Sequence, residues 1–461
     1  STLEAYFLGK KELFDGLAVS ELEKEWKRHP ILHIDLNIGK YDRPESLEDL
    51  LNRNLTEWEK IYGSDPAEVS LAMRFAGIVK RAALKTGERT VILVDEYDKP
   101  VLQAITDETL QNEYRSILKP FYGVLKSMDG YIRFALLTGV TKFGKVSVFS
   151  DLNNLFDISM DENYTSICGI SEKELLDNFD EDIRALAENN GQTYEEACAK
   201  LKENYDGYHF YPGSTGIYNP FSLLNTFMKS RYGSYWFETG TPTYLVELLK
   251  SHKYSLYKLA HEKTTAKVLD SIDSASRNPV GVIYQSGYLT IKGFIPEPRI
   301  YELGFPNREV EEGFMDFLVP FYTPVEESES GFAVWEFIQD VKAGNVDGFM
   351  ERLQSFLADC PYEMAKDIEL HYQNVLFIVF RLAGLYTQVE YHTSRGRIDM
   401  VVQTADYVYV MEFKLDGSAE QAIEQIEERQ YDLPFAMDRR KVYKIGVNFS
   451  SETRNIDRWI I

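Results

Sequence analysis

The stretch GRIDMVVQTADYVYVMEFKL, residues 396–415, consists of two apolar runs joined by a short polar turn, and it predicts two neighbouring β-strands. Alternate residues of a strand share a face, so Glu412 and Lys414 point the same way, and Asp399 on the neighbouring strand can join them. Two carboxylates and an ammonium on a half-buried face are costly unless they bind something. Hard divalent cations prefer oxygen ligands, so the pattern predicts a Mg²⁺ or Mn²⁺ site with the chemistry of a phosphodiester hydrolase.

Two predicted helices flank this strand pair. The first, over residues 361–384, places Glu369 on an otherwise apolar face, where a lone carboxylate needs a partner; we expect it to contact the same metal. The second, SAEQAIEQIEERQ at 418–430, carries Gln425 beside its apolar stripe and faces the same edge of the sheet. An acid followed by E-x-K is common in charged chains, so the metal site is favoured by these features together and not by one alone.

The first third of the chain alternates helical patterns with short apolar strands. The strands are ILHIDLN at 31–37, TVILVDE at 90–96 and IRFALLTGV at 132–140, which predict a parallel sheet covered on both faces. Four aliphatic residues followed by Asp95 and Glu96 place two acids at a strand's carboxyl end, where they could serve Mg²⁺–phosphate and an attacking water. The string GVTKFGK at 139–145 follows these strands and lacks the Ser or Thr of a phosphate loop, so we do not interpret it as one.

Composition sets limits on the function. The chain has 461 residues, with 73 Asp and Glu against 50 Lys and Arg, and a net charge of −23. This balance argues against a general nucleic-acid coat but not against a nuclease with a metal and a local basic rim. Cys168, Cys198 and Cys360 lie far apart, so neither a disulfide framework nor a zinc site is expected, and a reducing cytoplasm is the expected compartment. There is no signal peptide and no apolar run of transmembrane length, so no membrane partner is expected.

Several long strings, spread over nearly all of the chain, resemble the AAA-ATPase-like family, a bacterial and archaeal group usually fused to a C-terminal PD-(D/E)XK nuclease superfamily domain. The strings that carry this resemblance are HIDLN (33–37), VILVDEYDKPV (91–101), LLTGVTKFGKVSVFSDLNNLFDIS (136–159), YDGYHF (205–210), YNPFSLLN (218–225), YWFETGTP (235–242), YQSGYLTI (284–291) and LGFPNREV (303–310).

The resemblance implies roles for residues of the N-terminal half. Asp95 would be the Mg²⁺-associated acid, Glu96 the catalytic base, and Thr138 the sensor of the terminal phosphate. In the family, a segment ending in a GKS-type phosphate loop precedes the helix that corresponds to residues 1–14, and this chain begins immediately after that position. ATP is therefore expected as a cofactor only where that loop is supplied. The YDKP string at 97–100 also recurs in the family, without a role that its residues explain.

For the C-terminal half, the resemblance implies that Asp399 and Glu412 bind the metal together with Glu369. Lys414 would orient or help deprotonate the attacking water, and Gln425 would act beside it. Tyr431 follows Gln425 in the family pattern and is a candidate for contact with nucleic acid. Arg397 is a second candidate for a phosphate contact, although an arginine in a turn leading to a strand is more often solvated.

The predicted fold class is α/β with three parts. Residues 1–160 would form an AAA-like core of the P-loop NTPase type that lacks its first strand and phosphate loop, 161–330 a helical lid with a winged element, and 335–461 a restriction-endonuclease-like PD-(D/E)XK domain. Within the lid, VIYQSGYLTIKGF at 282–294 and RIYELGFPN at 299–307 predict strands.

The predicted function is an ATPase-coupled, metal-dependent nuclease acting on nucleic acid, with DNA as the first expectation. The alternative is a nucleotide-dependent switch or scaffold whose terminal domain binds nucleic acid or a protein without cleaving it. The sequence leaves open the substrate's strandedness and sequence, the arginine finger, self-association into a homo-oligomer, and the pathway.

Overall fold

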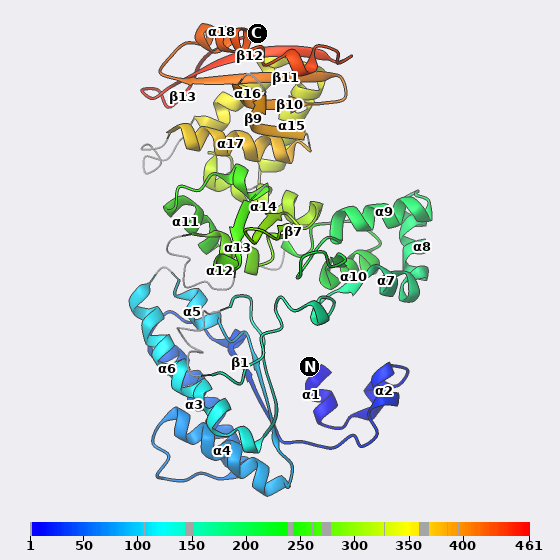
Figure 1. The fold of residues 1–461 in the computed structure, drawn as a ribbon, viewed down its shortest axis with the longest axis vertical. Helices are drawn as coiled ribbons and strands as arrows, with labels where there is room; N and C mark the ends of the chain where they lie inside the picture. Colours follow the sequence, from blue (N-terminus) through cyan, green and yellow to red (C-terminus); the bar gives the residue numbers. More distant parts are fainter. Residues whose placement is uncertain are drawn as a thin grey trace. The chain divides into compact units, whose positions relative to one another are not determined.

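The computed structural model describes residues 2–105, 107–142, 152–237, 243–260, 262–269, 278–326, 328–358, 368–384, 386–393 and 396–461. These residues belong to two compact units (Figure 1). The first unit is Ser1–Ile158 with Ala266–Ser286, and the second is Ser159–Thr265 with Gly287–Ile461. The three-part division expected from the sequence stays a prediction.

The first unit is built on a three-stranded parallel sheet in the order β1-β2-β3. Its strands are β1 (Ile31–Asp35), β2 (Thr90–Asp95) and β3 (Ile132–Leu137). Its helices are α1 (Thr2–Phe7), η1 (Lys11–Phe14), α2 (Ala18–Leu22), η2 (Leu36–Ile38), α3 (Glu45–Tyr62), α4 (Leu71–Thr86), α5 (Lys99–Gln103), α6 (Glu108–Ser127), η3 (Asp129–Tyr131), α12 (Ala266–Leu269) and α13 (Val280–Gln285).

Apolar contacts hold helices against β2, the middle strand of this sheet. Val91 and Leu93 of β2 form a buried cluster with Phe7 of α1. The first five residues of β2 are all buried, as expected for a strand covered on both faces. Helices α4 and α6 pack through the stacked rings of Phe75 and Phe121, whose centroids lie 4.5 Å apart. The sheet and its helices therefore hold the ends of β2 and β3 in a fixed register.

One part of the strand prediction for this region is wrong. Residues 282–285 belong to helix α13, and the strand expected from 282 begins only at Thr290. Short apolar runs fit both a buried helix and a strand, so their periodicity alone does not separate the two. Tertiary contacts of the folded chain determine that residues 282–285 are helical.

The second unit begins with a small helical group and a separate antiparallel sheet in the order β6-β8-β7. The strands of this part are β4 (Ile170–Ser171), β5 (Ile217–Tyr218), β6 (Glu262–Thr265), β7 (Thr290–Ile295) and β8 (Ile300–Gly304). Its helices are η4 (Glu162–Tyr164), α7 (Glu172–Asn178), α8 (Asp180–Asn189), α9 (Tyr194–Tyr205), α10 (Pro220–Lys229), α11 (Thr243–Ser251), η6 (Leu256–Ala260) and α14 (Arg308–Tyr322).

The rest of the second unit is a mixed five-stranded sheet in the order β13-β12-β11-β10-β9, with helices on both faces (Figure 1). Its strands are β9 (Tyr386–Thr393), β10 (Gly396–Gln403), β11 (Tyr407–Leu415), β12 (Lys441–Ser450) and β13 (Asn455–Ile460). Its helices are α15 (Ser330–Ala343), α16 (Val346–Leu357), α17 (Ile368–Leu382), α18 (Ala419–Arg429) and η9 (Leu433–Phe435). The parallel sheet of the first unit and the mixed five-stranded sheet of the second confirm the α/β fold class.

Helix α17 is fixed to the preceding part of the same unit by a buried side chain. Asn374 is 3% exposed; its Oδ1 accepts from the backbone N–H of Leu256 at 2.9 Å, and its Nδ2 donates to the carbonyl oxygen of Tyr254 at 3.1 Å. Arg381, further along α17, pairs with Glu311 of α14 at 3.0 Å. The C-terminal sheet and the segment before it therefore share a packed helix. Among the described helices, none combines the length and apolar character needed to cross a bilayer.

Candidate functional site

Glu412 lies in the middle of the C-terminal sheet, beneath helix α18. It is 2% exposed, and its partner in the parallel β11–β12 pair is Gly446. A Cβ atom on Gly446 would lie 2.3 Å from the carbonyl oxygen of Ala419, so only glycine lets the helix approach β12 this closely. The N-cap residue of helix α18 is Ser418, whose side chain forms a capping box with Gln421. Its buried Ala422 and Ile426 face the sheet, which directs Gln425 toward the acid.

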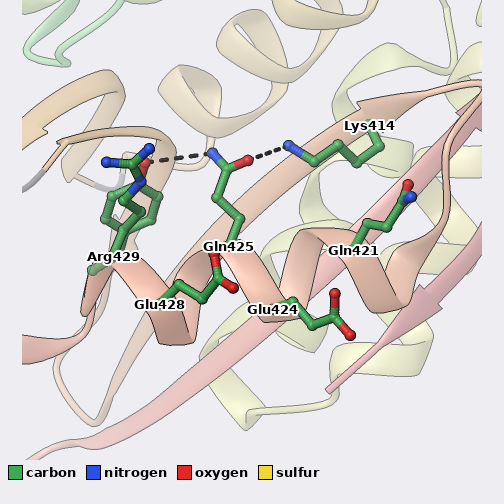
Figure 2. Close-up of a pocket in the computed structure, with 7 residues that line it drawn as sticks. Lys414, Gln421, Glu424, Gln425, Glu428 and Arg429 are labelled. Carbon is green, nitrogen blue, oxygen red and sulfur yellow. Dashed lines mark hydrogen bonds between the residues drawn. The ribbon is translucent and has the colours of Figure 1, made fainter.

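Gln425 bridges the two charged residues of β11. Its Oε1 accepts from Lys414 Nζ at 2.5 Å, and its Nε2 donates to Glu412 Oε1 (Figure 2). Lys414 Nζ also lies 3.3 Å from Glu412 Oε1. The expected shared face of Glu412 and Lys414 is thus observed, and the helix amide holds both groups.

Asp399 approaches the same place from β10. Its Oδ2 accepts from the backbone N–H of Phe413 at 2.9 Å. Phe413 lies between Glu412 and Lys414 in β11, so the Asp399 carboxylate contacts β11 at the position of these two residues. The pKa of Glu412 is raised to about 7, first because the carboxyl is buried and second because of the Asp399 charge, while Lys414 opposes the shift. Two neighbouring acids that disfavour each other's charge would both be relieved by a cation.

One oxygen of Glu412 has no protein partner in the described part of the chain. Oε2 is buried and accepts no hydrogen bond, although Oε1 receives two. A buried carboxylate oxygen without a donor is costly, and a divalent cation would satisfy it. Among the described residues, no group of three or more His, Cys, Asp or Glu side chains is arranged to hold a metal. This region contributes two carboxylates, those of Glu412 and Asp399, and carboxylate oxygens are ligands that Mg²⁺ and Mn²⁺ prefer.

Two of the predicted site residues can be placed only through their backbones. Glu369 lies in the first turn of α17, and Arg397 lies in β10 opposite His392 of β9. The side chains of Glu369 and Arg397 fall outside what the structure describes. Their predicted contacts with the metal and with phosphate stay predictions.

Tyr431, predicted to contact nucleic acid, is 2% exposed and packs in a cluster with Val401, Val408, Val410 and Ile426. Its hydroxyl accepts from Gln425 Nε2 at 3.4 Å. The ring is therefore inside the apolar layer under α18, and only the hydroxyl end reaches the polar row. This placement suits a residue that supports Gln425.

A pocket of about 490 Å³ opens beside these groups (Figure 2). Lys414, Gln425 and Tyr431 line it, and so do four residues of α18 that the sequence reading had not singled out for the site. These four are Gln421, Glu424, Glu428 and Arg429. Spacing of four residues along one helix would have suggested Gln421, Gln425 and Arg429 as a common face.

In the first unit, the three predicted nucleotide-site residues lie at the carboxyl ends of adjacent parallel strands. Thr138 donates its hydroxyl to Asp95 Oδ1 at 2.6 Å. Glu96 follows β2 with a φ of 55°, a left-handed conformation uncommon outside glycine. The pKa of Glu96 is raised, by burial first and then by the charges of Asp98 and Asp95. Asp95, Glu96 and Thr138 are brought together as expected from the strand ends.

Asp98, the second residue of the YDKP string, has a structural role. It is fully buried, and its Oδ2 accepts from the backbone N–H and the hydroxyl of Thr141, while Oδ1 accepts from Val140 N at 3.3 Å. A Cβ on Gly139 would lie 2.2 Å from Asp98 Oδ1, so glycine is needed at that contact. Asp98 therefore ties the segment after β2 to the segment after β3. Of the string GVTKFGK, residues 143–145 lie outside the described residues.

Comparison with known proteins supplies two domain matches. The family described as a predicted AAA-ATPase matches residues 1–149, and the PD-(D/E)XK nuclease superfamily matches residues 367–459. A protein of Azotobacter chroococcum mcd 1, described as an uncharacterized protein in the vnfD 5′ region, is 32% identical over 470 residues. That alignment covers 100% of this chain and 88% of the relative. No solved structure matches the chain.

Proposed function

Because the chain belongs to the family that joins a predicted AAA-ATPase domain to a PD-(D/E)XK nuclease superfamily domain, we propose that it hydrolyses phosphodiester bonds of nucleic acid, DNA in the first place. The observation that carries the proposal is the buried Glu412, whose Oε2 has no partner among the described residues while Asp399 and Lys414 lie beside it. A purely structural carboxylate would be expected to have both oxygens satisfied.

Glu412 and Asp399 would hold Mg²⁺ or Mn²⁺, with Glu369 as the third candidate ligand. When bound, the cation would stabilise negative charge on the phosphate under attack. Lys414 has three N–H donors and directs two of them to Gln425 and Glu412, which leaves one for a water or a phosphate oxygen. Gln425 fixes the position of the Lys414 ammonium, so this group is already placed to orient the attacking water.

We further propose that Asp95, Glu96 and Thr138 serve a bound nucleotide. The hydrogen bond from Thr138 to Asp95 supports this, because it links two strand ends that would both face the phosphates. Glu96 would polarise the attacking water, and its raised pKa suits a proton acceptor. ATP binding also needs a phosphate loop. We propose that the two domains are coupled, so that the nucleotide state of the first domain controls the nuclease activity of the second.

The test is nicking of supercoiled plasmid by the purified chain with Mg²⁺ or Mn²⁺. We expect Asp399→Ala and Lys414→Ala each to lose about 100-fold or more of the activity, as removal of a charge-stabilising group usually does. Glu427→Gln, at an exposed position of α18 that pairs with Lys444, is the matched control and should nick like the wild type. Equal nicking by all four proteins would indicate a contaminating nuclease and would contradict the proposal. Binding of DNA without any metal-dependent nicking would favour the switch or scaffold alternative.

A further inference from the structure

Helix α18 is acidic, and Arg429 is its one basic residue. In the described part of the chain, Arg429 has neither an ion pair nor a hydrogen bond from its guanidinium. Arg429 is exposed at the C-terminal end of the helix. Its guanidinium is therefore open to a ligand from outside the protein.

The glutamates of α18 are directed to other cations. Glu420 pairs with Arg458 at 2.9 Å, and Glu427 approaches Lys444 at 3.4 Å. Both of these cations come from the strands beside the helix, and not from α18 itself. The helix therefore turns part of its acidic surface toward β12 and β13, and it leaves Arg429 available to an outside ligand.

Arg429 and Lys414 line the same pocket, with Gln425 between them. Figure 2 shows the two cations on opposite sides of Gln425, while the carboxylate of Glu424 points away from the Lys414 amine. The result is a row of cation, amide and cation along one wall of the pocket. Such a row suits a ligand that carries negative charge at two separate points.

We propose that Arg429 binds a backbone phosphate of the nucleic-acid substrate, next to the phosphate that lies at Lys414. This inference rests on the proposed function, and it adds the substrate's second point of contact. A guanidinium presents paired donors that match phosphate oxygens, which an ammonium does not. A single terminal phosphate would use one cation only, whereas a polynucleotide offers successive phosphates to both. Glu424 and Glu428 line the same pocket and would repel a polyanion, which limits its path to the row of Lys414, Gln425 and Arg429.

Arg429 also stands in the last turn of α18, where any cation favours the carbonyl end of a helix. Arg429→Lys keeps that charge and removes the paired donors, so it separates the two roles. A helix-stabilising role alone predicts that Arg429→Lys behaves as wild type in every binding measurement. The phosphate contact predicts that the lysine variant binds the substrate more weakly while unfolding at the same temperature.

The experiment measures binding of a fluorescein-labelled DNA oligonucleotide by anisotropy, with Ca²⁺ in place of Mn²⁺, over a series of NaCl concentrations. For Arg429→Ala we expect Kd to rise roughly 5- to 10-fold at about 0.1 M NaCl, and the slope of log Kd against log salt to fall by about 1. In Mn²⁺-dependent nicking, KM should rise by a similar factor while kcat changes less than about 2-fold. Arg458→Ala removes an exposed arginine that is already paired, and it should match the wild type.

Unchanged Kd and unchanged salt slope in Arg429→Ala would overturn the inference, and so would a wild type that binds no DNA. Failure of the inference differs from failure of the proposed function. Binding that depends on Arg429 without metal-dependent nicking would leave the phosphate contact standing and remove the hydrolase. Nicking that depends on Lys414 but not on Arg429 would support the hydrolase and contradict the phosphate contact of Arg429.

Discussion

Gly446 lies directly opposite Glu412 in the parallel pairing of β11 and β12. The missing side chain at Gly446 gives α18 room to descend onto the sheet, with the Ala419 carbonyl where a Cβ would be. This close approach brings Gln425 within hydrogen-bonding reach of Glu412 and Lys414. The geometry of the candidate metal site thus depends on a residue that carries no chemistry of its own.

Gly446→Ala tests this dependence. The added methyl group should push α18 outward, lower the free energy of unfolding by about 1–3 kcal/mol, and reduce nicking at least ~10-fold through loss of the Gln425 contacts. Urea unfolding and plasmid nicking measure the two effects. Gly331→Ala is the control, because a Cβ at Gly331 in the same unit meets no neighbouring atom. Full activity in Gly446→Ala would show that the helix position does not matter.

Glu412→Gln tests the raised pKa of the buried acid. A carboxyl whose pKa is about 7 in the folded protein stabilises the fold fully below its unfolded value near 4.3, and it loses that contribution as pH rises through 7. The glutamine variant has no such loss. We therefore expect its stability relative to wild type to increase by on the order of 3 kcal/mol between about pH 4 and pH 8. Urea unfolding across this range, without divalent cations, is the measurement; a pH-independent difference would contradict the raised pKa.

The same shift predicts the pH dependence of metal binding. Protons and Mn²⁺ compete for Glu412, so the apparent affinity for Mn²⁺ should rise from about pH 6 to about pH 8 and level off above the pKa. Isothermal titration calorimetry in two buffers of different ionisation enthalpy would detect the released proton. Glu412→Gln should bind Mn²⁺ weakly, with no proton release. Proton-independent Mn²⁺ binding by the wild type would place the cation elsewhere.

Asp98→Asn tests the clamp between the ends of β2 and β3. The amide replaces an acceptor oxygen with a donor that faces the Thr141 N–H, so we expect a loss of about 2–4 kcal/mol in stability and faster hydrogen exchange at residues 139–142. Exchange followed by mass spectrometry reports on this segment directly. Asp129→Asn, at an exposed position in the same unit, should leave exchange unchanged. Protection equal to wild type in Asp98→Asn would exclude a clamping role.

Asn374→Leu tests the attachment of α17 to the segment before it. Leucine has the same branched shape but leaves the Leu256 N–H and the Tyr254 carbonyl without partners, which should cost about 2–4 kcal/mol. Limited proteolysis near 254–260 should become faster, and the Mn²⁺ concentration needed for nicking should rise if α17 positions Glu369. Asn225→Leu, at a half-buried position on α10 whose side chain donates to the Phe221 carbonyl of its own helix, is the control. Unchanged proteolysis in Asn374→Leu would show that the attachment holds without this residue.

Much of the chemistry could be predicted from the sequence because it depends on local geometry. The two-residue period of a strand places Glu412 and Lys414 on one face wherever the strand lies. Likewise, a strand such as TVILVDE ends with its acids at the carboxyl edge of a parallel sheet, which put Asp95 near Thr138. The stretch 282–285 was harder, because a short apolar run has no period long enough to separate helix from strand.

What the sequence by itself determined was the kind of chemistry: which residues are charged, which of them share a strand face, and which strands carry them. Only the tertiary structure decided which of these groups are satisfied. Gln425 bridges Glu412 and Lys414, Asp98 binds Thr141, and Arg429 keeps its charge unpaired, through contacts between segments distant in the chain. Hydrogen bonding and burial at such contacts depend on the packed neighbours, and sequence spacing does not specify them.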